Sequence, residues 1–170
     1  MLRKIVNLIW NDRELLFYIH DEKIEYNNDN VVIIENEIEP NIKLDVSYRN
    51  QISRELKNGS YCLALLDDDV MSAYILISKK STYISELDMD LLPDKDGCYV
   101  YAANTILEYR RRGLYRRLLE YACSKYDTVV IATDSKNVAS KNAIESLGFK
   151  MKFSLVKSKR LLKSSYCVKL

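Results

Sequence analysis

The chain has 170 residues, of which 48% are hydrophobic and 29% charged, and its formal net charge is +2. This length suits one domain with a core that needs no disulfides, and the low net charge argues against a protein that coats nucleic acid. Four cysteines lie apart without a Cys-x-x-Cys pair, and His20 is the single histidine. We therefore expect buried, reduced thiols in a cytoplasmic protein, a structural role for His20 and no metal site. Residues 5–10 form an apolar stretch, but it is too short and contains too many polar residues for a signal peptide or a membrane span. No membrane partner is therefore expected.

In the first half of the chain, residues 31–34 and 42–46 have strand-like composition, and residues 50–57 predict a short helix that ends at Gly59. Residues 61–66 and 70–77 predict two strands joined by the acidic turn at residues 67–69, which makes a hairpin. The acidic, turn-rich segment 86–97 reads as a loop inside the domain. The rest of residues 1–40 carries no clear pattern.

The second half alternates strands and helices. Residues 98–106 are nearly free of charge, which predicts a central strand covered on both faces. A helix is expected over about residues 113–126, a buried strand over 128–132, and a second helix that begins within residues 134–137. Its inner stripe would be Val138, the stem of Lys141, Ile144 and Leu147, with Gly148 as the stop. Residues 149–156 and 161–168 are further strand candidates.

The most informative segment is residues 110–115, an Arg-rich turn with one glycine between the central strand and the first of these helices. Such a turn presents free backbone N–H groups, the positive end of a helix dipole and several guanidinium groups at one place. It therefore predicts a site that binds a pyrophosphate.

Two blocks of residues resemble the Gcn5-related N-acetyltransferase (GNAT) family over roughly residues 98–156. The family's cofactor motif, Arg/Gln-x-x-Gly-x-Gly/Ala, is matched by Arg110 and Gly113. Its second element, Asn-x-x-Ala/Ser followed by Gly-Phe, is matched at Asn137, Ser140, Gly148 and Phe149. The chain departs from the first motif at Tyr115, where the family has a small residue that lets the helix backbone approach the phosphates.

The resemblance implies an α/β (α+β) fold with a mixed, mostly antiparallel central sheet flanked by helices, the fold of acyl-CoA N-acyltransferases. Residues 1–170 would form a single domain, in which residues 1–97 build the acceptor side and residues 98–170 bind acetyl-CoA. The implied activity is the transfer of acetyl from acetyl-CoA to a primary amine of a small molecule or peptide, by direct attack. The family would use no covalent enzyme intermediate and no metal.

Several residues would bind acetyl-CoA. Backbone N–H groups of Arg111, Arg112, Gly113, Leu114 and Tyr115 can hold the pyrophosphate. The outer phosphates have Arg110, Arg112, Arg116 and Lys141 as candidate partners, although each arginine could equally be a solvated surface charge. By resemblance, the strand edge at Thr105, Ile106 and Leu107 pairs with the pantetheine amides and polarises the thioester carbonyl. Asn137 and Ser140 would close on the pantetheine arm, and helix capping is the alternative role of Asn137.

The proton carriers are less evident. Many family members have a tyrosine four residues before the Gly-Phe pair, and this chain has Ile144 there. Tyr101 on the central strand and Glu86 on the acidic segment are our candidate catalytic residues. The alternative is a core aromatic residue and a solvated loop carboxylate.

Charge divides between the halves. Residues 1–97 hold 11 Lys or Arg against 19 Asp or Glu, and residues 98–170 hold 15 against 5. The acidic half favours a cationic amine acceptor, such as an amino sugar, polyamine, aminoglycoside or peptide amine, unless the charges merely cluster on solvated faces. Two other functions stay open: a CoA-binding regulatory domain without turnover, and a nucleic-acid-binding module that uses the basic cluster at residues 110–117, which the apolar helix face argues against. The sequence also leaves open whether the protein forms a homodimer.

Overall fold

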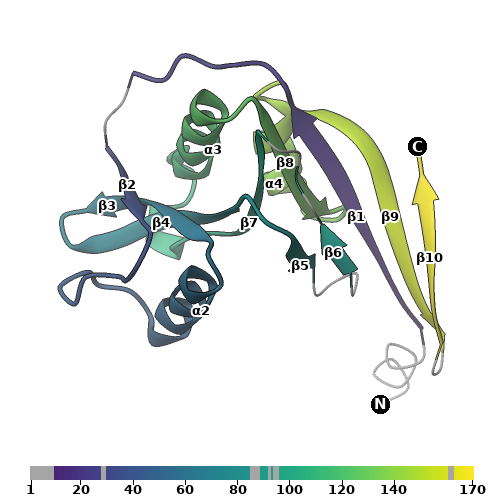
Figure 1. The fold of residues 1–170 in the computed structure, drawn as a ribbon, viewed down its shortest axis with the longest axis horizontal. Helices are drawn as coiled ribbons and strands as arrows, with labels where there is room; N and C mark the ends of the chain where they lie inside the picture. The colour runs from purple at the N-terminus through teal and green to yellow at the C-terminus, as the bar shows by residue number, and fades with distance from the viewer. Residues whose placement is uncertain (1–9, 28–29, 85–88, 92, 94–95, 161–162) are drawn as a thin grey trace.

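The computed structural model describes residues 10–27, 30–84, 89–91, 93, 96–160 and 163–170 (Figure 1). Within these residues the chain forms an eight-stranded sheet, a separate two-stranded sheet and three α-helices. In chain order the elements are β1 Trp10–His20, β2 Val31–Ile34, α2 Val46–Lys57, β3 Tyr61–Asp67, β4 Val70–Ser78, β5 Thr82–Ile84, β6 Met89–Leu91, β7 Gly97–Thr105, the 3-10 helix η1 Leu107–Tyr109, α3 Leu114–Lys125, β8 Thr128–Asp134, α4 Val138–Glu145, β9 Lys150–Arg160 and β10 Lys163–Lys169.

The large sheet has the strand order β10-β9-β1-β8-β7-β4-β3-β2. Each neighbouring pair is antiparallel except β7 and β8, which run parallel. Parallel neighbours need a crossover connection, and α3 lies in the connection between these two strands. The predicted α/β class with a mixed, mostly antiparallel sheet and flanking helices is thus confirmed.

The two faces of the sheet carry different helices. Side chains alternate across a strand, so on β4 Ile75 faces Leu118 of α3 and Ile144 of α4. The next residue, Leu76, packs instead with Ile52 of α2. It follows that α3 and α4 cover one face and α2 covers the opposite face (Figure 1).

The strand β1 lies between β9 and β8 near the middle of the sheet, although its sequence did not indicate a strand. Tyr18 belongs to the core under α3 and α4. The alternate residues Leu15 and Phe17 form another cluster with Ile84 of β5 and Tyr99 of β7. The short β5–β6 hairpin therefore packs on the same face of the sheet as α2.

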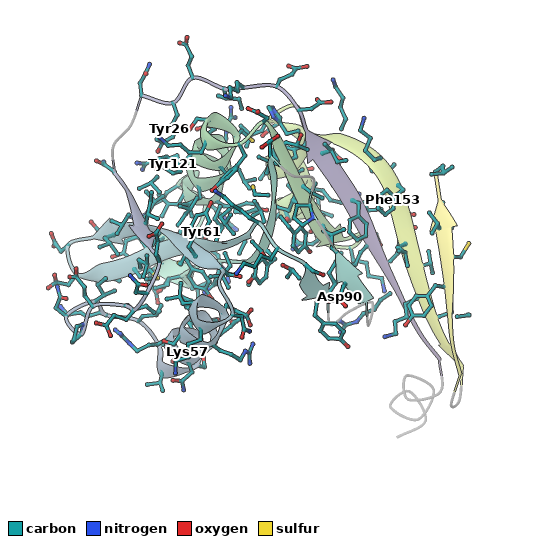
Figure 2. All side chains as sticks on the ribbon, viewed as in Figure 1. Tyr26, Lys57, Tyr61, Asp90, Tyr121 and Phe153 are labelled. Carbon is teal, nitrogen blue, oxygen red and sulfur yellow. The ribbon has the colours of Figure 1, made fainter. Side chains whose placement is uncertain are left out.

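Two contacts tie the N-terminal part of the chain to the helices. The Tyr18 hydroxyl donates a hydrogen bond of 2.7 Å to Oε1 of Glu145 at the end of α4. After β1 the chain crosses α3, where the Tyr26 ring packs edge-on against Tyr121 with 5.3 Å between ring centroids (Figures 1 and 2). His20 is buried with its ring centroid 5.0 Å from that of Phe149, which places it among core side chains.

Three local expectations were wrong. Residues 42–46 form no strand: Lys43 makes only an isolated bridge to Val70, and α2 begins at Val46 because the Asp45 side chain accepts a 2.8 Å hydrogen bond from the Ser47 N–H and caps it. The acidic segment expected to be a loop contains β6. Val138 is 62% exposed and is not part of the inner stripe of α4. It is the first residue of the helix and lies outside the part of α4 that packs on the sheet.

Three of the four thiols are buried, at Cys62, Cys98 and Cys123, whereas Cys167 on the edge strand β10 is exposed and corrects the expectation for that residue. Burial raises the pKa of Cys62 and of Cys123 to about 12.

Among the described residues, no helix is long and apolar enough to cross a membrane. The same part of the chain contains no group of three or more His, Cys, Asp or Glu residues placed to hold a metal ion.

Candidate active site

The two parallel strands in the middle of the sheet pair over only part of their length. Four residue pairs join β7 to β8, from Gly97 with Thr128 to Val100 with Ile131. Beyond Val100 and Ile131 the strands diverge, so residues 101–105 of β7 and 132–134 of β8 do not pair with each other (Figure 1). Diverging parallel strands leave backbone N–H and C=O groups available to an extended ligand that carries amides.

A cavity of about 880 Å³ lies at this divergence. From the α3 and α4 face, Tyr115, Asn137 and Ser140 line it. From the opposite face it is lined by residues of α2, β5, β6 and β1. The polar and aromatic side chains of the wall include Arg13, Arg54, Glu55, Ser60, Asp90, Tyr99, Tyr101 and Asp134. The cavity thus reaches both faces of the sheet through the gap between the strands.

A β-bulge in β7 borders the cavity. Tyr74 pairs with Asn104 and Leu76 with Tyr101, so Ala102 and Ala103 together lie opposite the single residue between Tyr74 and Leu76. Ala102 has a positive φ of 47°, which is uncommon for a residue with a side chain. A bulge leaves its extra residue outside the ladder and re-aims the neighbouring groups, and both alanines line the cavity.

The predicted strand edge at Thr105, Ile106 and Leu107 lies elsewhere. The Ile106 N–H donates to the Ser72 carbonyl at 3.0 Å, and the Thr105 carbonyl accepts from Nε of Arg110 at 3.1 Å. Leu107 is 70% exposed, and the three residues are absent from the cavity wall. The bulge lies two to three residues earlier in the chain, and it lines the cavity together with residues 99–101 of β7.

The Arg-rich turn leads into α3 with Gly113 as the N-cap, at φ 72°. Arg111 is also left-handed, at φ 63°. A Cβ added at Gly113 would meet no atom within 4 Å, and the first turn of α3 contains no acidic residue among Leu114 and its neighbours. An open space in front of an uncompensated helix N-terminus fits a pyrophosphate.

Most guanidinium groups of this turn have partners within the protein. Arg112 donates to the Glu108 carbonyl at 3.2 Å and lies 4.9 Å from the centroid of the Tyr109 ring. Arg116 forms an ion pair with Glu120 at 3.0 Å. Nε of Arg110 donates to the Thr105 carbonyl. The pairs are exposed and weak enough to exchange for a phosphate.

Tyr115 points toward α4 rather than away from the cavity. Its hydroxyl is hydrogen-bonded to Ser140, and burial raises its pKa to about 12 although that bond acts to lower it. Oδ1 of Asn137 accepts the Ser140 N–H at 3.1 Å and caps α4, so the alternative capping role of Asn137 is present. Lys141 is half-buried and does not line the cavity.

The opposite end of the cavity holds a cluster of Glu55, Ser60 and Tyr101. The Tyr101 hydroxyl lies 2.6 Å from Oγ of Ser60 and donates to Oε2 of Glu55 at 3.2 Å. Oε1 of Glu55 pairs with the exposed Arg54 at 3.0 Å. Burial is the main reason why the pKa of Tyr101 rises to about 12, so its hydroxyl keeps its proton at neutral pH.

Of the two predicted proton carriers, Tyr101 lies in this cluster, and Glu86 lies outside the described residues.

Glu55 was not identified as a candidate from the sequence. A signal was present, because Glu55 lies three residues after Ile52 and beside Leu56, the two buried residues of α2. A carboxylate on the inner stripe of an amphipathic helix is unusual and points to a role. The residue where many GNAT proteins have tyrosine, Ile144, is fully buried in the core.

No family model and no curated protein matches the sequence. Solved structures do match the fold. A GNAT-family protein from Novosphingobium aromaticivorans has a TM-score of 0.59 at 17% identity, covering 88% of this chain and 66% of its own. A conserved protein of unknown function from Staphylococcus epidermidis scores 0.57 at 13% identity, covering 94% and 66%. A GNAT-family acetyltransferase from Colwellia psychrerythraea scores 0.56 at 13% identity, covering 94% and 62%.

This chain therefore spans slightly less than two thirds of the length of the solved proteins that it resembles. The likeness confirms the GNAT fold, which the two motif blocks predicted.

Proposed function

We propose that the protein is an N-acetyltransferase that moves acetyl from acetyl-CoA to a primary amine. The observation that carries this proposal is one continuous cavity between the diverging strands, which is lined by Tyr115 of α3 at one end and by Glu55 of α2 at the other. A cofactor bound at the N-terminus of α3 could extend its pantetheine arm between β7 and β8. Its thioester would then meet an acceptor held on the α2 face. On this proposal residues 1–97 and 98–170 act as one unit, because each contributes one end of the cavity.

We assign the diphosphate to the turn at residues 111–115. The N–H groups at the start of α3 have no helical partners, and Gly113 leaves room for an anion to approach them. Arg110, Arg112 and Arg116 are placed to exchange their exposed internal contacts for phosphate oxygens.

We assign polarisation of the thioester carbonyl to the bulge at Ala102 and Ala103 instead of residues 105–107. A backbone N–H aimed at the carbonyl oxygen stabilises the negative charge that develops there when the amine attacks. The Ile106 N–H already has a partner, whereas the bulge lies outside the regular ladder and on the cavity wall.

Glu55 is the proposed general base. The acceptor enters as an ammonium ion, Glu55 takes its proton, and the free amine forms a C–N bond with the carbonyl carbon. The C–S bond then breaks and the sulfur leaves as a thiolate, which takes up the second proton that the nitrogen must lose to become a neutral amide. A thiol has an ordinary pKa of about 8.5, so its departure places less demand on an acid than an alkoxide would, which fits Ile144 at the position of the usual tyrosine. Tyr101 and Ser60 orient the carboxylate.

The test combines binding and turnover. Calorimetry with CoA and with acetyl-CoA should show a one-to-one complex, and thiol release should appear when primary amines are added. Binding without thiol release above the hydrolysis background, over a broad amine panel, would favour the regulatory domain without turnover. Absence of both binding and release would refute the proposal. Retention on heparin that falls steeply with salt, without retention on immobilised CoA, would favour nucleic-acid binding instead.

A further inference from the structure

The acidic excess of residues 1–97 lies mostly away from the candidate active site. Glu35, Glu37 and Glu39 line a separate hollow beside β2, and the acidic turn at residues 67–69 joins β3 to β4. Among the described acidic residues of this half, Glu55 and Asp90 are the ones that line the active-site cavity. The overall charge of this half therefore gives no reason to expect a polycation in the cavity.

The cavity also contains Arg13, a cation without an ion-pair partner in the described part of the chain. Arg13 lies on β1, two residues before Leu15 and on the same side of the strand, which is the face of Tyr99. Among the residues that the structure describes, Arg13 has no hydrogen-bond or ion-pair partner, whereas Arg54 on the α2 side of the same cavity is paired with Glu55.

Asp134 and Asp90 line the same cavity, and neither forms an ion pair with Arg13. Asp134 is paired in register with Leu15, and its Oδ1 accepts the Lys136 N–H at 2.9 Å without forming an ion pair with Arg13. Asp90 on β6 lines the cavity and has no partner in the described part of the chain (Figure 2). As far as the described residues go, the β1 side of the cavity thus offers an unpaired guanidinium group to a ligand.

We propose that the amine acceptor also carries a carboxylate, which Arg13 binds, so that the substrate class is an amino acid or another amino carboxylate. This inference rests on the proposed acetyl transfer. A guanidinium group binds a carboxylate through two parallel hydrogen bonds, which gives affinity and orientation. With the carboxylate at Arg13, the amine lies toward Glu55 and Tyr101.

The stacked rings of Tyr99 and Tyr101 support this arrangement. Their centroids are 5.6 Å apart and their planes are parallel, and both rings line the cavity. An ammonium group is attracted to the face of a tyrosine ring. A diamine would instead bring a second ammonium toward Arg13, where like charges repel.

The experiment compares acceptors that differ only at the end remote from the amine. The compounds are 4-aminobutyrate, 5-aminopentanoate and 6-aminohexanoate, their primary amides, and the diamines of the same lengths. We also include lysine with lysinamide. We expect the KM of the best carboxylate to be about tenfold or more below that of its amide, since a charge-assisted hydrogen bond is lost. The diamines should be the poorest acceptors.

Arg13→Gln should remove the preference of the carboxylate over its amide by raising KM for the carboxylate alone, with kcat for the amide unchanged. Arg13→Lys should restore part of the preference. Lys57→Gln is the matched control, because Lys57 is an exposed cation at the end of α2 that does not line the cavity (Figure 2). Thermal melting should give the same midpoint for Arg13→Gln and the wild type, since Arg13 is exposed and unpaired.

A binding measurement separates the two proposals. Ligand-observed NMR with CoA-saturated protein reports carboxylate binding without turnover. Acetylation of amides or diamines as efficiently as carboxylates, unaffected by Arg13→Gln, would overturn the carboxylate proposal and leave acetyl transfer intact. Binding of carboxylates that depends on Arg13, without acetylation of any amine, would refute acetyl transfer and support the carboxylate site. Neither binding nor acetylation would overturn both.

Discussion

The hydroxyl of Tyr101 on β7 donates a 3.2 Å hydrogen bond to Oε2 of Glu55 on α2, at one end of the cavity that opens where β7 leaves β8. Ser60, at the loop before β3, lies 2.6 Å from the same hydroxyl. Because a hydroxyl has one proton to donate, its bond to Glu55 leaves Ser60 as the donor to Tyr101. The carboxylate therefore stands at the end of a short chain of hydrogen bonds that fixes its orientation.

Glu55→Gln tests the base. Glutamine keeps the size of the side chain and can still accept from Tyr101, but it takes no proton from an ammonium ion. We expect kcat to fall by about 10²- to 10⁴-fold, the usual contribution of a general base, while the affinity for CoA stays the same. Steady-state thiol release and CoA calorimetry on the same preparation measure both.

Tyr101→Phe is the companion variant. It removes the hydroxyl that orients Glu55 and should reduce kcat less than Glu55→Gln does. The double variant should be no slower than Glu55→Gln alone, because Tyr101 acts through Glu55. A full additive loss, or an active Glu55→Gln enzyme, would contradict the assignment.

Gly113→Ala separates folding from cofactor binding. The left-handed φ of 72° makes alanine unfavourable by about 1–2 kcal/mol, but its methyl group meets no protein atom. The variant should therefore fold with a modest loss in the free energy of unfolding. Its affinity for CoA should fall at least tenfold, because the methyl group occupies the space assigned to the pyrophosphate. Urea unfolding and calorimetry provide the two readings, and an unchanged dissociation constant would place the phosphates elsewhere.

Asn137 has two roles that a pair of variants can distinguish. Asn137→Ala removes the cap of α4 and should lower the free energy of unfolding by about 1 kcal/mol. Asn137→Ser restores a capping oxygen but lacks the amide NH₂ group. If Asn137 also binds the pantetheine arm, Asn137→Ser keeps the stability of the wild type and binds CoA more weakly. Wild-type affinity in Asn137→Ser would leave Asn137 with the capping role alone.

The sequence predicted the parts of this molecule that depend on local pattern. The hairpin of β3 and β4 follows from two apolar runs around the acidic turn, and α3 follows from apolar residues at helical spacing after Gly113. The α4 cap at Asn137 is likewise local, and so is the left-handed turn at Gly148, with its φ of 84°, although α4 itself ends earlier, at Glu145. These features persist because the neighbouring residues alone favour them.

Features that depend on distant partners were not predictable in this way. The strand β1 is stabilised by β8 and β9, which lie more than a hundred residues later in the chain. Glu55 acquires its place only when α2 packs beside β7, and the bulge at Ala102 exists only in the register between β4 and β7. Likewise, nothing in the composition of β7 or β8 indicates where the two strands diverge.

Alkaline pH should destabilise the protein. The pKa of Tyr18 is raised to about 12, mainly by burial and then by its hydrogen bond to Glu145. Burial raises those of Tyr115 and Tyr126 to about 12 as well. A tyrosine whose pKa is higher in the folded protein than its ordinary 10.0 stabilises the fold fully below pH 10. That stability is lost as the pH rises through 10 toward 12, and the buried thiols act in the same direction.

Urea unfolding at a series of pH values, followed alongside tyrosinate absorbance, measures this loss. Exposed tyrosines should ionise first, and the remainder should ionise together with unfolding. Tyr18→Phe should be less stable at neutral pH by about 1 kcal/mol, the usual contribution of a hydrogen bond, and should show a shallower alkaline decline. A decline of the same steepness would mean that Tyr18 is not among the groups responsible.

The ring of Tyr115 stands where GNAT proteins have a small residue, and it contacts Ser140 across the cofactor end of the cavity. A pantetheine arm that runs past this end of α3 and α4 into the gap between β7 and β8 must break the hydrogen bond to Ser140, at a cost of about 1 kcal/mol, and must also displace the ring. Tyr115→Ala removes both costs, so the affinity for CoA should rise by more than the roughly fivefold that the hydrogen bond alone accounts for, although the free energy of unfolding falls because the ring packs on the core.

Tyr115→Phe provides the control. It keeps the ring at this end of the cavity and loses only the bond to Ser140, so its affinity should lie between those of the wild type and Tyr115→Ala. Calorimetry with CoA orders the three proteins. If Tyr115→Ala binds CoA more weakly than the wild type, the ring forms part of the binding surface instead of obstructing it. The pantetheine arm would then run along the tyrosine, and the departure from the family's small residue would serve binding.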